Sequence, residues 1–226
     1  MSHVSSTPPL PDPHDHEFEP VPGLPAPLPE GERILWQGRP AWTRLAIHAF
    51  HVRKVAVYFA ALLAWVVASA IADGDTLAET AKTAAMVTVG GAVAVGILAA
   101  LGFFSAKATV YTITDRRIVL RIGIALPLVI TVPFNLIAIA RFRPQSKGIG
   151  DIPVALISGE RIGFGILWPH ARPWKLGRPQ PMLRCVPEGA AVATVLASAL
   201  RADMARRKAG DEAEPAMAPH TAQAAE

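Results

Sequence analysis

The sequence is poor in cysteine, in charge and in recognisable catalytic motifs. Cys185 is the one cysteine among 226 residues, which excludes an intramolecular disulfide and a multi-cysteine zinc site. We expect it to be a buried, unreactive thiol within a strand. No HExxH, GxSxG, P-loop or dinucleotide-binding motif occurs, and no nucleophile–base pair is apparent. We therefore expect a protein that is not an enzyme and holds no resident metal or cofactor.

Charged residues are absent from two long runs, residues 55–72 and 84–104. The whole chain is 51% hydrophobic and 18% charged, which is more apolar than an ordinary soluble domain. At a rise of ~1.5 Å per helical residue, each run can cross a hydrocarbon core of ~30 Å, the first only just. The runs predict a transmembrane helical hairpin over residues 55–104. The alternative is a buried helical hairpin in a soluble protein.

The charges around this hairpin differ in sign. The link Asp73–Thr83 holds Asp73, Asp75 and Glu79 against a single lysine, Lys82. Basic residues flank the hairpin on both sides: Arg33, Arg39, Arg44, Arg53 and Lys54 before it, and Lys107, Arg116, Arg117 and Arg121 after it. The positive-inside rule therefore predicts a multi-pass membrane protein with both termini in the cytoplasm and the acidic link outside. The net charge of +4 fits basic flanks, and we expect no binding to nucleic acid.

Lysine and arginine are also absent from residues 1–30, which hold nine prolines. Without a basic start and an apolar run, this segment is not a signal peptide. We expect a disordered, proline-rich arm. Two alternatives stay open: docking of residues 20–29 as a polyproline II helix, and metal binding by His3, His14 and His16.

Residues 31–54 are interpreted as a membrane-surface segment. The short apolar run Ile34–Trp36 is either a strand or a surface anchor. Trp36 and Trp42 suit a membrane interface, because an indole has an apolar body and one N–H donor. Residues 42–52 predict a short amphipathic helix.

Residues 106–208 predict a small strand-rich module. Its first stretch, YTITDRRIVLRIGI at 111–124, predicts two strands around a turn at Asp115 and Arg116. Apolar runs between turn residues predict seven strands: Ala108–Thr114, Arg116–Ile122, Leu128–Val132, Leu136–Arg143, Ile152–Ile157, Ile162–Leu167 and Pro181–Val186.

A helix follows the predicted strands over Glu188–Lys208. Its apolar face is formed by Val192, Val195, Leu196, Ala199, Leu200 and Met204. The whole pattern predicts an α+β membrane protein, in which the hairpin precedes a PH-like antiparallel β-roll closed by a C-terminal helix. Residues 209–226, rich in alanine and acidic residues, predict a disordered tail.

Several motifs resemble known families. GERILWQGRP before the hairpin, with YTITDRRIVLRIGI and VPFNLIAIARFRP after it, resembles bacterial membrane-anchored PH-like proteins. The stretches FEPVPGLPAPLPEGERILWQGRP at 18–40 and WPHARPWKLGRPQPMLRCVPEGAAVATVLASAL at 168–200 are similar to the PuhB family of photosynthetic-complex assembly proteins. This resemblance implies a non-catalytic assembly factor in the photosynthetic membrane of a purple bacterium. Its implied partners are subunits of the reaction centre and of the core light-harvesting antenna.

The candidate contact residues are tryptophans, cations and small residues, which are enriched at binding surfaces, at anionic lipid or at helix–helix interfaces. They are Trp36, Arg39, Ala92, Gly96, Arg116, Arg117, Trp168, His170, Arg172, Trp174 and Lys175. Ala92 and Gly96 form a small-xxx-small pair that suits contact with the first span, a second copy of the chain or a client protein.

Histidines are weighed separately. We expect His170 to lie in a surface loop as a hydrogen-bonding residue, with axial ligation of a pigment or haem as the alternative. His48 and His51 are either interfacial polar residues or one helix face offered to a pigment.

An alternative function for the chain is a membrane-tethered module that reads anionic lipid headgroups. An enzyme acting on lipid or pigment is a third, poorly supported hypothesis.

Overall fold

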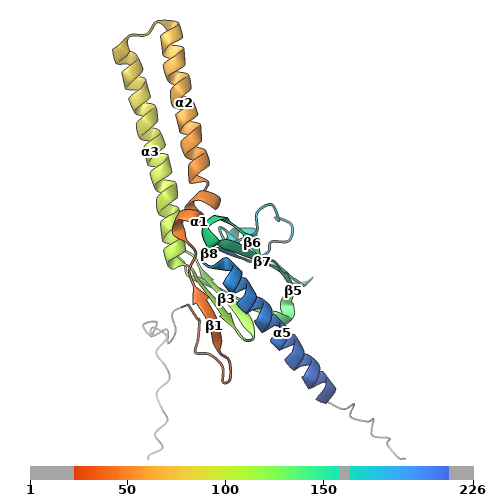
Figure 1. Ribbon diagram of the computed structural model, residues 1–226. Helices are drawn as coiled ribbons and strands as arrows, with labels where there is room; N and C mark the ends of the chain where they lie inside the picture. The colour runs from red at the N-terminus through yellow and green to blue at the C-terminus, as the bar shows by residue number, and fades with distance from the viewer. Residues whose placement is uncertain (1–22, 158–162, 214–226) are drawn as a thin grey trace, which may run out of the picture.

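The computed structural model describes residues 23–157 and 163–213 and consists of a helical hairpin standing on a small α+β domain (Figure 1). The elements are β1 (Ile34–Gly38), α1 (Trp42–His48), α2 (Val52–Asp73), α3 (Leu77–Ala108), β2 (Val110–Thr114), β3 (Arg117–Ile122), β4 (Leu128–Pro133), a 3₁₀ turn (Phe134–Leu136), β5 (Ile137–Ala140), β6 (Arg143–Pro144), a second 3₁₀ turn (Ser146–Gly148), β7 (Gly150–Leu156), α4 (Phe164–Leu167), β8 (Met182–Val186) and α5 (Gly189–Ala213).

The hairpin is formed by α2 and α3, which contain 22 and 32 residues. Gly74 ends α2 in the left-handed conformation, and a capping box between Thr76 and Glu79 starts α3. Both helices are long and apolar enough to cross a membrane, and only 6% of the most apolar stretch of each is buried. The domain of the same chain therefore does not cover the hairpin, as the alternative of a buried helical hairpin would require.

Two glycines allow close helix packing at the hairpin. A Cβ atom at Gly91 would lie 2.9 Å from Cγ of Phe59 on α2, and one at Gly102 would lie 2.8 Å from Cβ of Ala46 on α1. Trp42 of α1 also packs edge-on against Phe103, with ring centroids 5.8 Å apart. The short helix α1 is therefore fixed against the base of α3, beside the start of α2 (Figure 1).

The domain contains two antiparallel sheets. The first has the order β1-β2-β3-β4, with Trp36 opposite Ile113 and Tyr111 opposite Leu120. In the second, β7 pairs with β5 and β6 on one side and with β8 on the other. Pro153 in β7 has no N–H, so the ladder is irregular where β5 gives way to β6.

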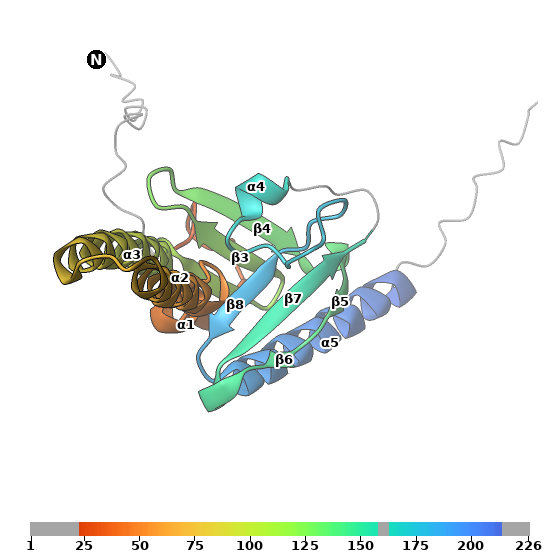
Figure 2. The same ribbon diagram turned by 90° about the horizontal axis from the view of Figure 1, so that it is seen from above.

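The core lies between the sheets and is completed by α5. Tyr111, Ile113, Leu183 and Leu196 are all at most 1% exposed. Seen along the hairpin, α2 and α3 lie at one side of the domain, and α5 runs along the domain away from them (Figure 2). This is the PH-like arrangement that the sequence predicts.

Several predicted boundaries are wrong. Residues 31–54 are not one surface segment, because β1 pairs with β2 inside the first sheet. Residues 23–30 do not form a disordered arm, since Leu24 is buried and only 2% exposed. Residues 209–213, predicted to be in the tail, belong to the helix α5, which continues to Ala213. The histidine cluster proposed as a metal site lies wholly within residues 1–22, which are outside the described residues. The segment 20–29 of the polyproline alternative lies partly within them.

Two of the predicted strands differ from the elements that the structure shows. The described part of the strand predicted at 162–167 is the helical turn α4, in which the N–H groups of Ile166 and Leu167 donate to the carbonyl of Gly163 at 3.2 Å. A short apolar run without clear alternation does not distinguish a strand from a helical turn. The predicted strand 136–143 is divided into β5 and β6 opposite Pro153.

Candidate contact surface beside the helical hairpin

An exposed loop between α4 and β8 lies beside the base of α2. We call residues 168–181 the tryptophan loop. Its ends are tied together by a bridge between Ala171 and Pro181 and by hydrogen bonds from the backbone N–H of Arg172 to the carbonyl of Gln180 (3.0 Å) and from that of Met182 to the carbonyl of His170 (2.9 Å). Its outer part carries Trp174, which is 94% exposed, and Leu176, which is 66% exposed. The two ends of the loop are therefore held together, and its outer part exposes apolar side chains on the protein surface.

His170 anchors this loop inside the protein and is fully buried. Its Nε2 lies 3.0 Å from Oγ1 of Thr109, and its Nδ1 lies 2.6 Å from the hydroxyl of Tyr111. The Thr109 hydroxyl donates its proton to the carbonyl of Ser105 at 2.7 Å, so it accepts from His170. The imidazole is therefore neutral, with its proton on Nε2, and its Nδ1 accepts the proton of the Tyr111 hydroxyl.

Burial and, secondarily, the neighbouring Arg184 guanidinium lower the pKa of His170 to about 3. Burial also raises the pKa of the Tyr111 hydroxyl. The same hydroxyl accepts a hydrogen bond from the backbone N–H of Arg184 at 3.2 Å. Neutral His170 thus joins the end of α3 and strand β2 to the tryptophan loop.

Arg184 joins the same loop to α1. Its Nη1 donates to the carbonyl of Pro169 at 2.9 Å, and its Nη2 donates to the carbonyl of His48 at 2.7 Å. The residue is 7% exposed, and its Nε has no hydrogen-bond partner. Within the described residues, no carboxylate forms an ion pair with this guanidinium.

A pocket of about 360 Å³ opens between the tryptophan loop and the base of α2; we call it the base pocket. The α1–α2 segment contributes Ala49, His51 and Lys54, and the other wall contains Phe164, Trp168, Ala171, Pro173, Trp174, Leu176 and Arg184. The ring of Trp168 is held edge-on against Phe50, with centroids 5.1 Å apart. The described lining is thus mostly apolar, with two cationic side chains, Lys54 and Arg184, and no acidic residue.

The predicted contact residues lie at several separate places in the structure. Trp168, Trp174 and Lys175 lie in the tryptophan loop and are exposed, and Arg172 beside them donates to Oε1 of Gln180 at 2.8 Å. Arg39 is exposed beside a second pocket, also lined by Lys107 and Arg121, under the β3–β4 turn. His170 lies within the loop by residue number, but its side chain is not on the loop surface. The expectation that it lies on the surface is wrong, because its side chain fills a polar site in the core.

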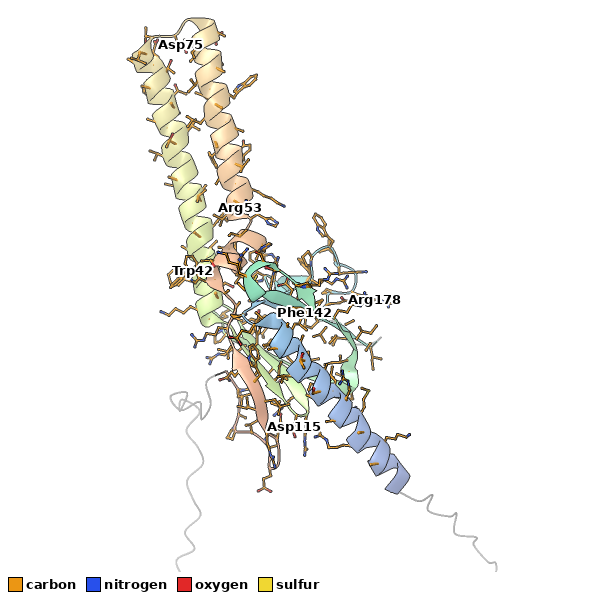
Figure 3. All side chains as sticks on the ribbon, in the orientation of Figure 1. Trp42, Arg53, Asp75, Asp115, Phe142 and Arg178 are labelled. Atoms are coloured by element: carbon orange, nitrogen blue, oxygen red, sulfur yellow. The ribbon has the colours of Figure 1, made fainter. Side chains whose placement is uncertain are left out.

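Three further candidates do not lie beside the tryptophan loop. Arg116 and Arg117 lie at the turn beside Asp115. This turn is at the opposite end of the molecule from Asp75, which lies in the link between α2 and α3 (Figure 3). Arg117 makes a bidentate ion pair with buried Glu32, with both N–O distances 2.9 Å. Trp36 packs partly buried against the domain core. Trp36 therefore belongs to the sheet domain and not to a separate membrane-surface segment, whereas contact of Arg116 and Arg117 with lipid or a partner stays a prediction.

Ala92 and Gly96 are exposed on α3, and the close contact with α2 is made at Gly91 instead. The first span is therefore not the partner of the small-xxx-small pair. His48 ends α1, and His51 precedes α2 with a left-handed φ of 57°, so the two histidines do not share one helix face. Burial lowers the pKa of His48.

Sequence reasoning missed Arg184, Lys54 and Phe50 as parts of this surface. A signal for Arg184 was present, because it is a single charge in the otherwise apolar strand MLRCV. Its neighbour Cys185 is fully buried, and burial raises the pKa of its thiol to about 12. This agrees with the expectation of an unreactive cysteine in a strand.

Comparison with known families identifies the domain. A model of the bacterial PH domain family matches residues 50–200. The chain belongs to the bacterial PH domain family. The matched residues run from the base of the hairpin into α5, whereas β1, which completes the first sheet, precedes them.

A relative in Rhodobacter capsulatus, described as an uncharacterized 23.7 kDa protein in the puhA 5′ region, is 41% identical over 192 residues. The alignment covers 84% of this chain and 90% of that protein. No solved structure matches this bacterial PH domain protein.

Proposed function

We propose that the protein is a non-catalytic membrane assembly factor for the photosynthetic reaction centre and its core light-harvesting antenna. The observation that carries this proposal is the relative whose description locates it in the 5′ region of the photosynthesis gene puhA. That relative is similar over nearly its whole length, so the likeness includes the hairpin as well as the domain. The resemblance of residues 18–40 and 168–200 to the PuhB family supports the same role.

The hairpin would hold the protein in the inner, photosynthetic membrane. Basic residues at its base, such as Arg53 and Lys107, and carboxylates at its tip, such as Asp73 and Asp75, favour cytoplasmic termini and a periplasmic tip. Reporter fusions at residues 78 and 208 test this topology. An exported signal at residue 208 would contradict it.

The tryptophan loop would supply the contact with a client subunit. Trp174 is almost fully exposed, and Arg172 and Lys175 lie beside it. Tryptophan and arginine are frequent at binding hot spots. The loop base is fixed by His170 and Arg184, and Pro173 and Pro179 restrict its outer part, so less ordering entropy is lost on binding. The exposed face at Ala92 and Gly96 would add a contact within the membrane, to a client or to a second copy of the chain.

Deletion of the gene in its phototrophic host tests the function. We expect a loss of assembled reaction centre and core antenna, with pigment synthesis intact, and recovery when the full chain is supplied. Intact membranes would be analysed by absorption spectra and by native gel electrophoresis. Normal levels of both complexes in the deletion strain would contradict the assembly role.

A further inference from the structure

We propose that the base pocket binds the headgroup of an anionic phospholipid. The inference uses the proposed insertion of α2 in a membrane but does not depend on the assembly role. The occupant is assigned from three observations: the charge of the pocket, an uncompensated buried cation, and continuity with the exposed surface of α2.

The first observation is the charge of the lining. Lys54 projects from the first turn of α2 and is exposed, and Arg184 forms part of the inner wall. Among the residues that the structure describes, 23–157 and 163–213, no aspartate or glutamate lines the pocket. Two cations without a lining carboxylate favour a phosphate or another anion over a zwitterionic group.

The second observation concerns Arg184. Its guanidinium is nearly buried, and within the described part of the chain it donates only to two backbone carbonyl groups, those of Pro169 and His48. The neighbouring carboxylate of Asp151 accepts the backbone N–H of Cys185 at 2.7 Å and does not pair with Arg184. A buried charge without a counter-ion is unfavourable, so an anion in the adjoining pocket would stabilise this arrangement.

The third observation separates a lipid from a soluble anion. Val57 and Tyr58 follow Lys54 by three and four residues on α2 and are 68% and 62% exposed. An acyl chain can therefore run along this helix face from a phosphate held at Lys54. On the other side of the pocket, Trp174 and Leu176 offer exposed apolar surface, and an indole suits a membrane interface.

The test compares two lipids that share their acyl chains, one with a net negative headgroup and one with a zwitterionic headgroup. The full chain, purified in a neutral detergent, is mixed with equal amounts of phosphatidylglycerol and phosphatidylcholine with the same acyl chains, and bound lipid is measured by native mass spectrometry. We expect phosphatidylglycerol to be preferred roughly tenfold. Lys54→Ala should lower this preference about fivefold, while Lys54→Arg keeps it.

The matched control is Lys82→Ala, which removes the same charge at the other end of the hairpin and should leave the preference unchanged. Equal binding of the two lipids, or an equal loss in both alanine variants, would overturn the proposal. Inorganic phosphate is added in a separate arm. If it displaces phosphatidylglycerol at equal concentration, the pocket is a site for free phosphate and the lipid assignment is wrong. The readout involves no photosynthetic complex, so its outcome is independent of the assembly proposal.

Discussion

The helical hairpin and the sheet domain place their apolar side chains in opposite ways. On the hairpin, Val57, Trp65 and Met86 are each more than 60% exposed, whereas in the domain Ile113 and Leu196 are at most 1% exposed. The domain is therefore stabilised by burial within its own chain. The hairpin has only a few close contacts between its helices, and its exposed apolar surface suits a surrounding apolar phase. The same kind of substitution should have different consequences in the two regions.

The largest effect is expected from a charge placed in the domain core. Leu196→Asp puts an unpaired carboxylate where α5 covers the sheets, which should cost about 4 kcal/mol or more and unfold the domain. The hairpin should keep its helical structure in detergent, because its apolar surface does not depend on the domain core. Thermal unfolding of the full chain, followed by circular dichroism, measures both parts.

Met204→Asp is the matched control for this substitution. Met204 lies on the apolar face predicted for the same helix but is 61% exposed, so the change should stay within ~0.5 kcal/mol. If Leu196→Asp left a cooperative unfolding transition of normal midpoint, α5 would not be part of the core.

The comparison also explains what the sequence predicts well. An uncharged run long enough for a membrane and an alternating pattern such as YTIT are local signals, and both the hairpin and the strands β2, β3, β4 and β8 follow them closely. The assignment of β1 required pairing with β2, which is far along the chain. Trp36 of β1, taken by itself, suits a membrane interface as well as it suits a strand.

The candidate contact surface was predicted only in part for the same reason. Trp174 and Lys175 are exposed as expected, because the proline-rich sequence around them is a loop by local chemistry. His170 is buried because Thr109 and Tyr111, some sixty residues earlier, satisfy both of its nitrogens. Arg184 and Lys54 are brought to one pocket by the packing of α1, and no local pattern encodes that contact.

A second difference between the regions should appear when the pH is lowered. Unfolded His170 takes up a proton near pH 6.5, whereas in the folded domain its pKa is about 3. Between these values the unfolded state binds more protons, so the stability contributed by neutral His170 is complete above pH 6.5 and is lost as the pH falls toward 3. Denaturant unfolding of the full chain between pH 7 and pH 4 should show the domain weakening.

His170→Leu is the comparison variant for the pH series. At pH 7 it should destabilise the domain by about 1–3 kcal/mol, since the hydroxyls of Thr109 and Tyr111 lose their partner. Its remaining pH dependence should be flatter than that of the native chain. Equal slopes for the two proteins would show that other groups cause the acid sensitivity.

An effect confined to the hairpin is expected from a larger side chain between α2 and α3. In Gly91→Val the new side chain meets the ring of Phe59, so overpacking should destabilise the contact between α2 and α3 by about 1–3 kcal/mol. Gly96→Val is the matched change, because a Cβ there has no neighbour within 4 Å. Unfolding of the full chain in mixed micelles with SDS compares the two variants. Equal destabilisation would contradict the packing at Gly91, and a change in oligomer size with Gly96→Val would indicate that α3 contacts a second copy.

The smallest effect on stability, and the most informative for function, is expected in the tryptophan loop. Trp174→Ala together with Arg172→Ala removes an exposed indole and a half-buried guanidinium whose one side-chain hydrogen bond is to Gln180. Neither belongs to the anchor formed by His170 and Arg184, so stability should change by no more than ~0.5 kcal/mol. If this loop binds a client subunit, the yield of assembled core complex should fall at matched expression. Arg116→Ala, an exposed arginine at the far turn, should leave that yield normal. A normal yield from the double variant would exclude the loop from client binding and direct the search to the exposed face of α3 at Ala92 and Gly96.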